Sequence, residues 1–310
     1  MPELSIVIPF CNEYPQVLFT VRNIAEELLG RVDFEIIAVN NYCEEVEKQN
    51  RIQDKGFEAL EACQGKGNPW LRVLHYGKKL SHWNSKNWAV KHSSAKFLWF
   101  VDAHCMVGRN SLFNMFNYYK ENYEELNGTL HMPLTYKILE YHRLIYKLVV
   151  NESIGEYHYS FTTPRDQGIC YQVPCMSCCG VMMTRDIYNQ LGGWPERLGI
   201  YGGGEHFINF TSAILGKTIN IFSDSVCYHH GEKRGYNWNY DDYTRNRIIA
   251  TYMFGGTELA RKYTDNRKGS KVVLNNIFED VITSCKEHRE FIKANQKITI
   301  QEWAAKWLEK

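Results

Sequence analysis

The sequence predicts an α/β fold in which a mostly parallel central sheet is flanked by helices and followed by a helical C-terminal extension. Two observations carry this prediction. Up to about residue 104, short apolar runs of strand length alternate with segments of helical periodicity. The chain also has 310 residues, of which 44% are hydrophobic, and this is enough for a large core. Strands joined by helices run parallel, because a parallel connection needs a long crossover.

The first part of the chain gives one signal for each element. Strands are expected at residues 5–10, 35–41, 71–77 and 96–104, and helices at 15–29, 44–62 and 84–94. The segment 15–29, for example, repeats apolar side chains at helical spacing through Val17, Val21 and Ile24. Ligands bind at the carboxyl ends of strands in such sheets, so polar residues that follow the strands are the first candidates for a site.

The order of elements becomes mixed after residue 108. Helices are expected at 110–126, 140–150, 186–191 and 205–215, strands at 129–136, 178–185 and 218–230, and a loop at 151–175. Three helical segments follow, at 242–262, 275–293 and 299–309. We therefore expect one α/β domain over residues 1–255, with a helical extension over 256–310 packed on it.

Composition and cysteine usage limit the class of protein. The net charge of +1 provides no global field that would recruit nucleic acid or an anionic membrane. No apolar run approaches the roughly 20 residues of a membrane span, and the N-terminus does not read as a signal peptide. Ten cysteines without such a signal indicate free thiols in a reducing compartment, so we expect a cytoplasmic protein. Cys175, Cys178 and Cys179 lack a second pair at zinc-binding spacing and are expected to be buried structural thiols.

The segment FVDAHC (100–105) ends an apolar strand with two metal-capable side chains. Residues i and i+2 of a strand point to the same face, so Asp102 and His104 are candidates to bind one ion. A D-x-H motif alone is weak evidence, because polar residues also simply end strands.

Four collinear motifs make the interpretation specific: IPFCNE (8–13), FVDAHC (100–105), GGWPERLGIYGGGEHF (192–207) and VCYHHGEKRGY (226–236). Through them the chain resembles family 2 nucleotide-diphospho-sugar glycosyltransferases of the GT-A fold. The motifs are similar to those of polypeptide N-acetylgalactosaminyltransferases. The resemblance implies a GT-A fold and transfer of a sugar from a nucleotide-diphosphate donor, with a UDP-sugar favoured, to an acceptor hydroxyl.

The resemblance also implies a divalent metal ion bound by Asp102, His104 and a late histidine. His229 and His230 are the candidates for the third ligand, and on a strand only one of them faces the ion. We favour His229. Carboxylate and imidazole together suit Mn²⁺, with Mg²⁺ as the alternative. Such an ion neutralises the charge on the leaving diphosphate as a Lewis acid.

By the same resemblance, the donor is bound at the ends of the first strands. The implied residues are Pro9, Phe10, Asn12, Glu13, Asn40, Asn41, Lys86, Asn87 and Asp102. Family members usually carry an aspartate where this chain has Asn40 and Asn41, and an amide can accommodate a different base. For Lys86, a plain surface lysine is the alternative.

Glu205 follows a glycine-rich segment and is expected to open a helix. In inverting relatives an acid here acts as general base on the acceptor, whereas in retaining relatives the matching acid binds donor sugar hydroxyls. Both roles stay open, and a carboxylate at a helix start also simply complements the helix dipole. Trp194 and Tyr201 are candidates to stack on a sugar ring, with core packing as the equal alternative.

Two acceptor classes stay open: a glycan or small molecule, and a hydroxymethylated base of viral DNA. Residues 62–101 contain seven Lys/Arg and no acid, and residues 232–271 contain nine Lys/Arg, five acids and interleaved aromatics. This pattern suits a phosphate backbone with an unstacked base. Alternatively, the first stretch serves the donor diphosphate and the second is a solvated helix face. A catalytically inactive nucleotide-sugar-binding or scaffold module is the alternative function.

Overall fold

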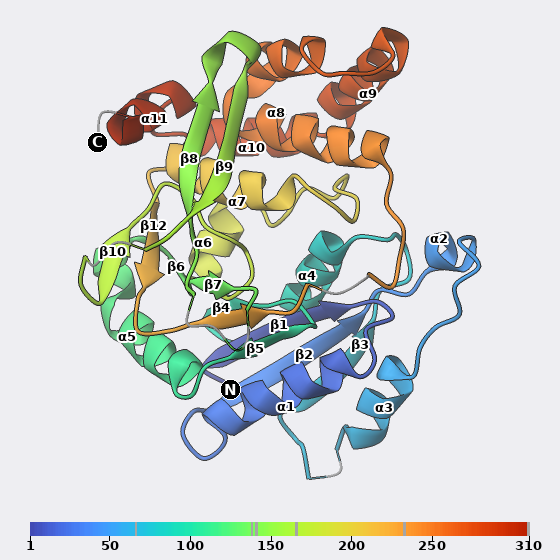
Figure 1. The fold of residues 1–310 in the computed structure, drawn as a ribbon, viewed down its shortest axis with the longest axis vertical. Coiled ribbons are helices and arrows are strands. Elements are labelled where there is room, and N and C mark those ends of the chain that lie inside the picture. Colours follow the sequence, from blue (N-terminus) through green and yellow to red (C-terminus); the bar gives the residue numbers. More distant parts are fainter. Residues whose placement is uncertain (66, 138, 140–141, 165–166, 232–233, 309–310) are drawn as a thin grey trace.

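The computed structural model describes residues 1–65, 67–137, 139, 142–164, 167–231 and 234–308. Its centre is an eight-stranded sheet in the order β10-β12-β6-β11-β4-β1-β2-β3 (Figure 1). The strands are β1 (Leu4–Phe10), β2 (Phe34–Asn40), β3 (Leu71–His75), β4 (Phe97–Phe100), β6 (Gly128–His131), β10 (Cys170–Gln172), β11 (Val181–Thr184) and β12 (Thr218–Phe222).

The sheet is mixed. Strands β4, β1, β2 and β3 lie parallel, as does the pair β6 and β12. Strand β11 runs antiparallel to both of its neighbours, and β10 runs antiparallel to β12. The predicted α/β fold is confirmed, and the parallel arrangement holds for the strands that alternate with helices in the sequence.

Helices cover both faces of the sheet. They are α1 (Gln16–Leu28), α2 (Glu44–Glu47), α3 (Gly56–Cys63), α4 (His82–Lys91), α5 (Ser111–Leu126), α6 (Arg185–Gln190) and α7 (Gly204–Ile214). Helices α1 and α5 contact each other, whereas α4 packs on β1 and β2 from the opposite side (Figure 1). The predicted helix over 44–62 is wrong in its middle, because it is split into α2 and α3.

The C-terminal part of the described chain is helical, as predicted. It consists of α8 (Tyr240–Asp265), α9 (Lys271–Ser284), α10 (Lys286–Asn295) and α11 (Ile300–Leu308). Helix α8 continues through the expected boundary at residue 255, but Gly256 breaks it with a φ of 76°. The core is continuous from Ile6 of β1 to Trp303 of α11. The division of the chain at residue 255 stays a prediction.

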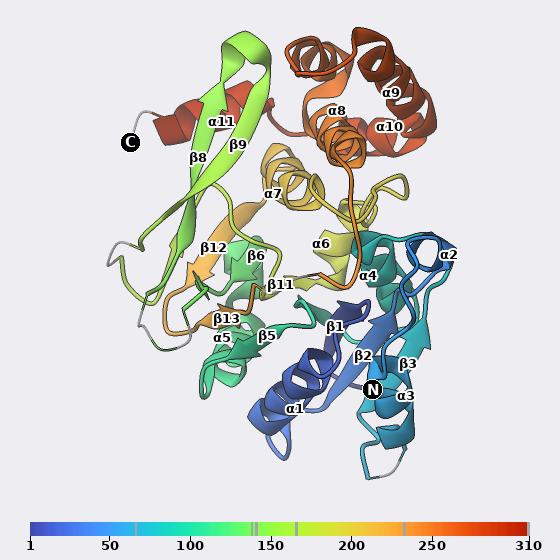
Figure 2. The same cartoon turned by 45° about the vertical axis from the view of Figure 1, so that its right-hand side comes forward.

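A two-stranded hairpin lies where the sequence predicts a helix followed by a loop. Strands β8 (Ile145–Asn151) and β9 (Glu156–Thr162) pair along their whole length, so the helix expected at 140–150 and the loop expected at 151–175 are both wrong; residues 140, 141, 165 and 166 lie outside the described part. Burial in β8 alternates from Tyr146 on, with Tyr146, Leu148 and Val150 less exposed than the residues between them, as on one face of a strand. Figure 2 shows the hairpin beside the C-terminal helices, far from β1–β3.

Three expected strands are shortened or interrupted, and the first two of these changes shape the site. Strand β4 ends at Phe100, so Asp102 and His104 lie in the turn before β5 (Cys105–Val107) and not on the strand. The segment 218–230 is divided into β12 and β13 (Cys227–His229), and 129–136 into β6 and β7 (Leu134–Thr135). Strands β5, β13 and β7 form a small separate sheet beside the large one.

Candidate active site

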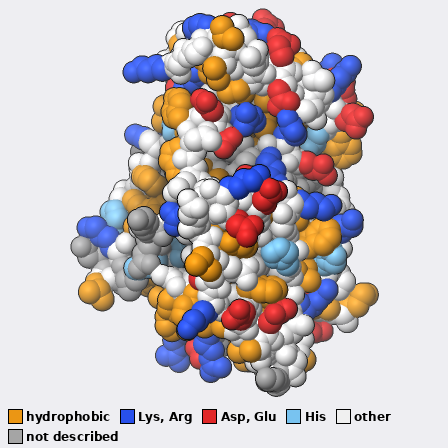
Figure 3. Space-filling model, turned by 90° about the vertical axis from the view of Figure 1, so that its right-hand side faces the viewer, with side chains coloured by type: hydrophobic (Ala, Val, Ile, Leu, Met, Phe, Trp, Pro, Cys, Tyr) orange, Lys and Arg blue, Asp and Glu red, His pale blue; other side chains and the backbone are white. Residues whose placement is uncertain are grey.

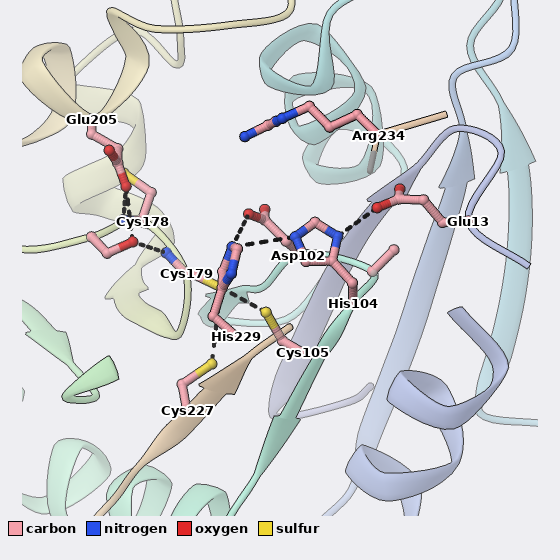
Figure 4. A network of polar contacts seen from close by, with 12 residues as sticks. Glu13, Asp102, His104, Cys105, Cys178, Cys179, Glu205, Cys227, His229 and Arg234 are labelled. Carbon is pink, nitrogen blue, oxygen red and sulfur yellow. Dashed lines mark hydrogen bonds and ion pairs between the residues drawn. The ribbon is translucent and has the colours of Figure 1, made fainter. Parts of the chain in front are cut away.

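The pairing of β13 with β5 brings the late histidine to the D-x-H turn. In this antiparallel register His229 lies opposite Cys105, the residue after His104. The Nε2 atom of His229 is 3.2 Å from Nε2 of His104 and 3.8 Å from Oδ2 of Asp102. The three side chains are between 16% and 27% exposed. Figure 4 shows them converging between β4, β5 and β13.

These three side chains fit a divalent cation. Their ligand atoms all lie within 4.8 Å of one another. Nitrogen and oxygen ligands lie about 2.0–2.2 Å from such an ion, so neighbouring ligand atoms around it are roughly 3–3.5 Å apart. The separations of 3.2 Å between the two Nε2 atoms and 3.8 Å between Nε2 of His229 and Oδ2 of Asp102 are close to this range. Two imidazole Nε2 atoms at 3.2 Å can share only one proton, so a cation also suits this pair. The assignment of Asp102, His104 and His229 as ligands stays a prediction.

Asp102 is kept ionised by a buried lysine. The Nζ atom of Lys86 is 3.4 Å from Oδ1 of Asp102. Burial alone would raise the pKa of Asp102, but the Lys86 ammonium and the neighbouring histidines outweigh it and hold this pKa well below its usual range. Burial would likewise lower the pKa of Lys86, but Asp102 outweighs it and raises this pKa. Lys86 is only 1% exposed, so the surface-lysine alternative is wrong.

Glu13 contacts the histidine of the motif. Its Oε1 is 2.5 Å from Nδ1 of His104, and its Oε2 accepts a hydrogen bond from the Cys11 amide. Burial alone would lower the pKa of His104, but Glu13 raises it from 6.5 to about 9. A carboxylate on Nδ1 fixes the ring and directs Nε2 toward the candidate ion site. Glu13 is predicted from its motif to bind the donor, and nothing in IPFCNE (8–13) indicates this contact across 91 residues.

The asparagines predicted to bind the donor have protein partners. Both N–H donors of Asn41 are used by the carbonyls of Tyr76 and Lys79, and its Oδ1 accepts from the Ser81 amide. Asn40 likewise donates to Gln53. Both side chains are 1% exposed. They hold the loop after β3 against the ends of β1 and β2.

Asn12 and Asn87 also bond to backbone. Asn12 joins the segment after β1 to Ile52 and Asp54. Asn87 bonds to both the amide and the carbonyl of Trp194, and so fixes the glycine-rich segment before Glu205. Pro9 and Phe10 instead line a narrow cavity at the end of β1, together with Asn41, Asp102, His104 and Arg234.

Glu205 lies in the first turn of α7, as predicted, and is held by three donors. Its Oε1 accepts hydrogen bonds from the Ser177 hydroxyl at 2.8 Å and from the Cys178 amide at 3.2 Å. Its Oε2 accepts from the Tyr159 hydroxyl. Gly203 precedes the helix with a φ of 76°, and a Cβ there would lie 2.2 Å from the Asn246 carbonyl oxygen. The glycine therefore permits the close approach of this turn to α8.

A cavity of about 460 Å³ joins Asp102 and His229 to Glu205. Aromatic side chains line much of it: Trp83, Tyr136, Tyr146, Tyr159, Phe161, Tyr201 and Tyr243. Three of these belong to the β8–β9 hairpin, which sequence reasoning missed because it assigned that segment to a helix and a loop. Tyr201 reaches the cavity. Trp194 is 1% exposed and packs on Trp83 and Phe100, so core packing is the correct reading for that residue.

Arg234 is a further site residue that no single motif position predicted. It borders both the narrow cavity and the large one, and its guanidinium lies over the Tyr201 ring. It has no carboxylate partner among the residues that the structure describes. Figure 4 shows its side chain extending across the site near Asp102 and His104. A cation in this position complements an anionic ligand.

The family model for glycosyl transferase family 2 matches residues 5–192, more than half of the chain. The chain belongs to this family. No curated protein sequence matches it. In the described part of the chain, no helix combines the length and the apolar character that crossing a bilayer requires.

Several solved glycosyltransferase structures have a similar fold. GalNAc-T7 with UDP, GalNAc and Mn²⁺ is 15% identical with a TM-score of 0.66, over 93% of this chain and 57% of that chain. S. aureus TarS 1-349 with UDP-GlcNAc is 12% identical with a TM-score of 0.55, over 92% and 73% of the two chains. The mannosyltransferase PcManGT from Pyrobaculum calidifontis, with GDP-Man and Mn²⁺, is 17% identical with a TM-score of 0.53, over 95% and 74%. The chain thus spans little more than half the length of GalNAc-T7, and the predicted GT-A fold is confirmed.

Proposed function

We propose that this chain is a divalent-metal-dependent glycosyltransferase that moves a sugar from a nucleotide-diphosphate donor to an acceptor hydroxyl. One observation carries the proposal: a carboxylate and two imidazoles converge beside a cavity that Asp102, His229 and Glu205 all line. Mn²⁺ and a UDP-sugar are the favoured metal and donor. GalNAc-T7 and PcManGT were both solved with Mn²⁺ and a nucleotide or nucleotide sugar, which supports this choice.

In the proposed reaction, Asp102, His104 and His229 hold the ion. The bound ion would neutralise negative charge on the leaving diphosphate as a Lewis acid. Glu13 keeps His104 oriented, and Lys86 keeps Asp102 ionised beside it. Arg234 has guanidinium N–H groups available at the same end of the cavity and would donate them to phosphate oxygens.

Glu205 would act at the sugar end of the cavity. Its carboxylate is held in one orientation by Tyr159, Ser177 and the Cys178 amide, and it borders the cavity that the donor sugar would enter. A fixed carboxylate there accepts a hydrogen bond from a sugar or acceptor hydroxyl without reorganising during the reaction.

We propose a carbohydrate or small-molecule acceptor in preference to DNA. Three of the nine basic residues in 232–271 are paired with acids of the same chain: Arg245 with Asp242, Arg261 with Glu279 and Arg267 with Glu156. On the face shown in Figure 3, basic side chains are interspersed with acidic ones. The aromatic cavity wall, in contrast, suits the apolar face of a sugar ring.

A donor screen tests the proposal. The protein would be incubated with a panel of UDP- and GDP-sugars and Mn²⁺, and the released nucleotide would be measured with and without EDTA. Glycan acceptors and hydroxymethylated DNA would then be offered with the productive donor. We expect release from one donor, loss of release with EDTA, and stimulation by a glycan. Release that persists in EDTA would contradict metal dependence, and no release or transfer with any donor and acceptor would favour the inactive binding module.

A further inference from the structure

A second group of metal-ligating side chains lies next to the candidate metal triad. Cys105 of β5, Cys179 before β11 and Cys227 of β13 are each at most 3% exposed. The Sγ of Cys179 is 3.0 Å from that of Cys105 and 3.9 Å from that of Cys227, and all three thiols are free. Figure 4 shows the three sulfur atoms gathered beneath His229. The large and small sheets therefore meet at a cluster of three thiols.

His229 connects this thiol cluster to the metal triad. Its ligand atom and those of Cys105 and Cys179 all lie within 4.8 Å of one another. The Nε2 atom of His229 faces Asp102 and His104, whereas its Nδ1 is buried and has no hydrogen-bond partner in the part of the chain that the structure describes. A buried imidazole nitrogen without a partner is costly, and the Asp102–His104–His229 site leaves it unexplained.

We propose that Cys105, Cys179 and His229, whose ligand atoms all lie within 4.8 Å of one another, form the base of a binding site for a thiophilic divalent ion such as Zn²⁺. Cys227 lies outside that group, and it becomes the fourth ligand when its side chain turns toward Sγ of Cys179, which is 3.9 Å away. Three cysteines and one histidine are a common zinc-binding set, and a Zn–S bond of about 2.3 Å places tetrahedral sulfur ligands about 3.8 Å apart. The sulfur separations of 3.0 Å and 3.9 Å in the structure lie on either side of that value. On binding, each coordinating thiol releases its proton to solvent.

The two adjacent sites differ in the ions that they prefer. Thiolates select Zn²⁺ and similar soft ions, whereas a carboxylate with imidazoles suits harder ions such as Mn²⁺. Because His229 belongs to both sites and a neutral imidazole has one nitrogen lone pair and one N–H, an ion on its Nδ1 leaves the proton on Nε2, which then cannot bind the ion of the other site. The thiol site is therefore inhibitory: its occupation weakens binding of the catalytic ion. This inference goes beyond the transferase activity.

Cadmium provides a direct probe, because Cd²⁺–thiolate bonds absorb in the ultraviolet. The protein would be kept reduced with a thiol-free reductant and titrated with Cd²⁺ in excess Mn²⁺. We expect one ion per chain with the absorption of three thiolates. Cys227→Ala should weaken this binding by at least about tenfold, the smallest loss that is typical even for a group that only supports a metal ligand. Cys285→Ala removes a buried thiol in the C-terminal helices and should titrate like the parent protein.

Two results would overturn the inference: a parent protein without the three-thiolate absorption, or a Cys227→Ala variant that binds Cd²⁺ as the parent does. If Cys227→Ala does not fold, alkylation of the parent protein with and without Zn²⁺ replaces it, with the modified cysteines identified by mass spectrometry. Zn²⁺ should slow alkylation of the three cluster thiols and leave alkylation of the exposed Cys63 unchanged. Alkylation of the cluster thiols at the same rate with and without Zn²⁺ would refute the site. These readouts need no turnover, so they are independent of the donor screen.

Discussion

The close approach of Gly203 to helix α8 predicts a large and specific effect of adding one methyl group. In Gly203→Ala, the new Cβ would lie 2.2 Å from the carbonyl oxygen of Asn246, in a backbone conformation with φ of 76°. Gly30→Ala is the matched control, because Gly30 has φ of 73° but nothing within 4 Å of an added Cβ. The control isolates the backbone cost of a left-handed alanine, about 1 kcal/mol.

The Gly203 variant adds overpacking of about 1–3 kcal/mol to that backbone cost, so its total loss of unfolding free energy is about 2–4 kcal/mol. Urea unfolding of both variants measures the difference. Because Gly203 adjoins Glu205, nucleotide release should also fall in Gly203→Ala and stay unchanged in Gly30→Ala. Equal destabilisation of the two variants would refute the claim that the glycine serves close packing on α8.

Three further predictions concern single side chains. His104→Ala should abolish metal-stimulated nucleotide release while the variant still unfolds in one cooperative urea transition; unaltered release would count against the metal site. Glu205→Gln should lower transfer by about 10²–10⁴-fold without changing Mn²⁺ affinity, measured by steady-state kinetics and titration, and a loss of Mn²⁺ binding instead would contradict the assigned role. Burial lowers the pKa of His131 from 6.5 to about 4, against the Ser177 carbonyl that raises it. Between pH 6.5 and pH 4 the unfolded chain therefore binds a proton that the folded chain does not, and the free energy of unfolding should fall by roughly 3 kcal/mol over this range. Urea unfolding of the parent protein and of His131→Gln across the same range measures this fall. A smaller fall in His131→Gln would assign it to His131, and an identical fall would contradict that assignment.

The sequence indicated the metal triad because its signals were local. The D-x-H spacing placed Asp102 and His104 together even though they lie in a turn and not on a strand. Strand alternation predicted only that one of His229 and His230 faces the ion, and β13 ends at His229. The register of β13 against β5 then supplied the long-range contact.

Other parts of the site depended on contacts that no local pattern contains. Glu13 meets His104 across 91 residues, and its motif suggested donor binding instead. The aromatic wall formed by the β8–β9 hairpin was missed, because Tyr146 and Val150 also have the i,i+4 spacing of a helix. The asparagines at the strand ends turned out to hold neighbouring loops, which depends on the path of those loops.

Binding of Mn²⁺ by the parent protein and by two neighbouring histidine variants tests the central claim most directly. Free and bound Mn²⁺ would be quantified by electron paramagnetic resonance in the parent protein, His229→Ala and His230→Ala. The account predicts one bound ion in the parent protein, loss of that ion in His229→Ala and retention in His230→Ala. Retention of full Mn²⁺ affinity in His229→Ala would contradict the assignment of Asp102, His104 and His229 as the metal site.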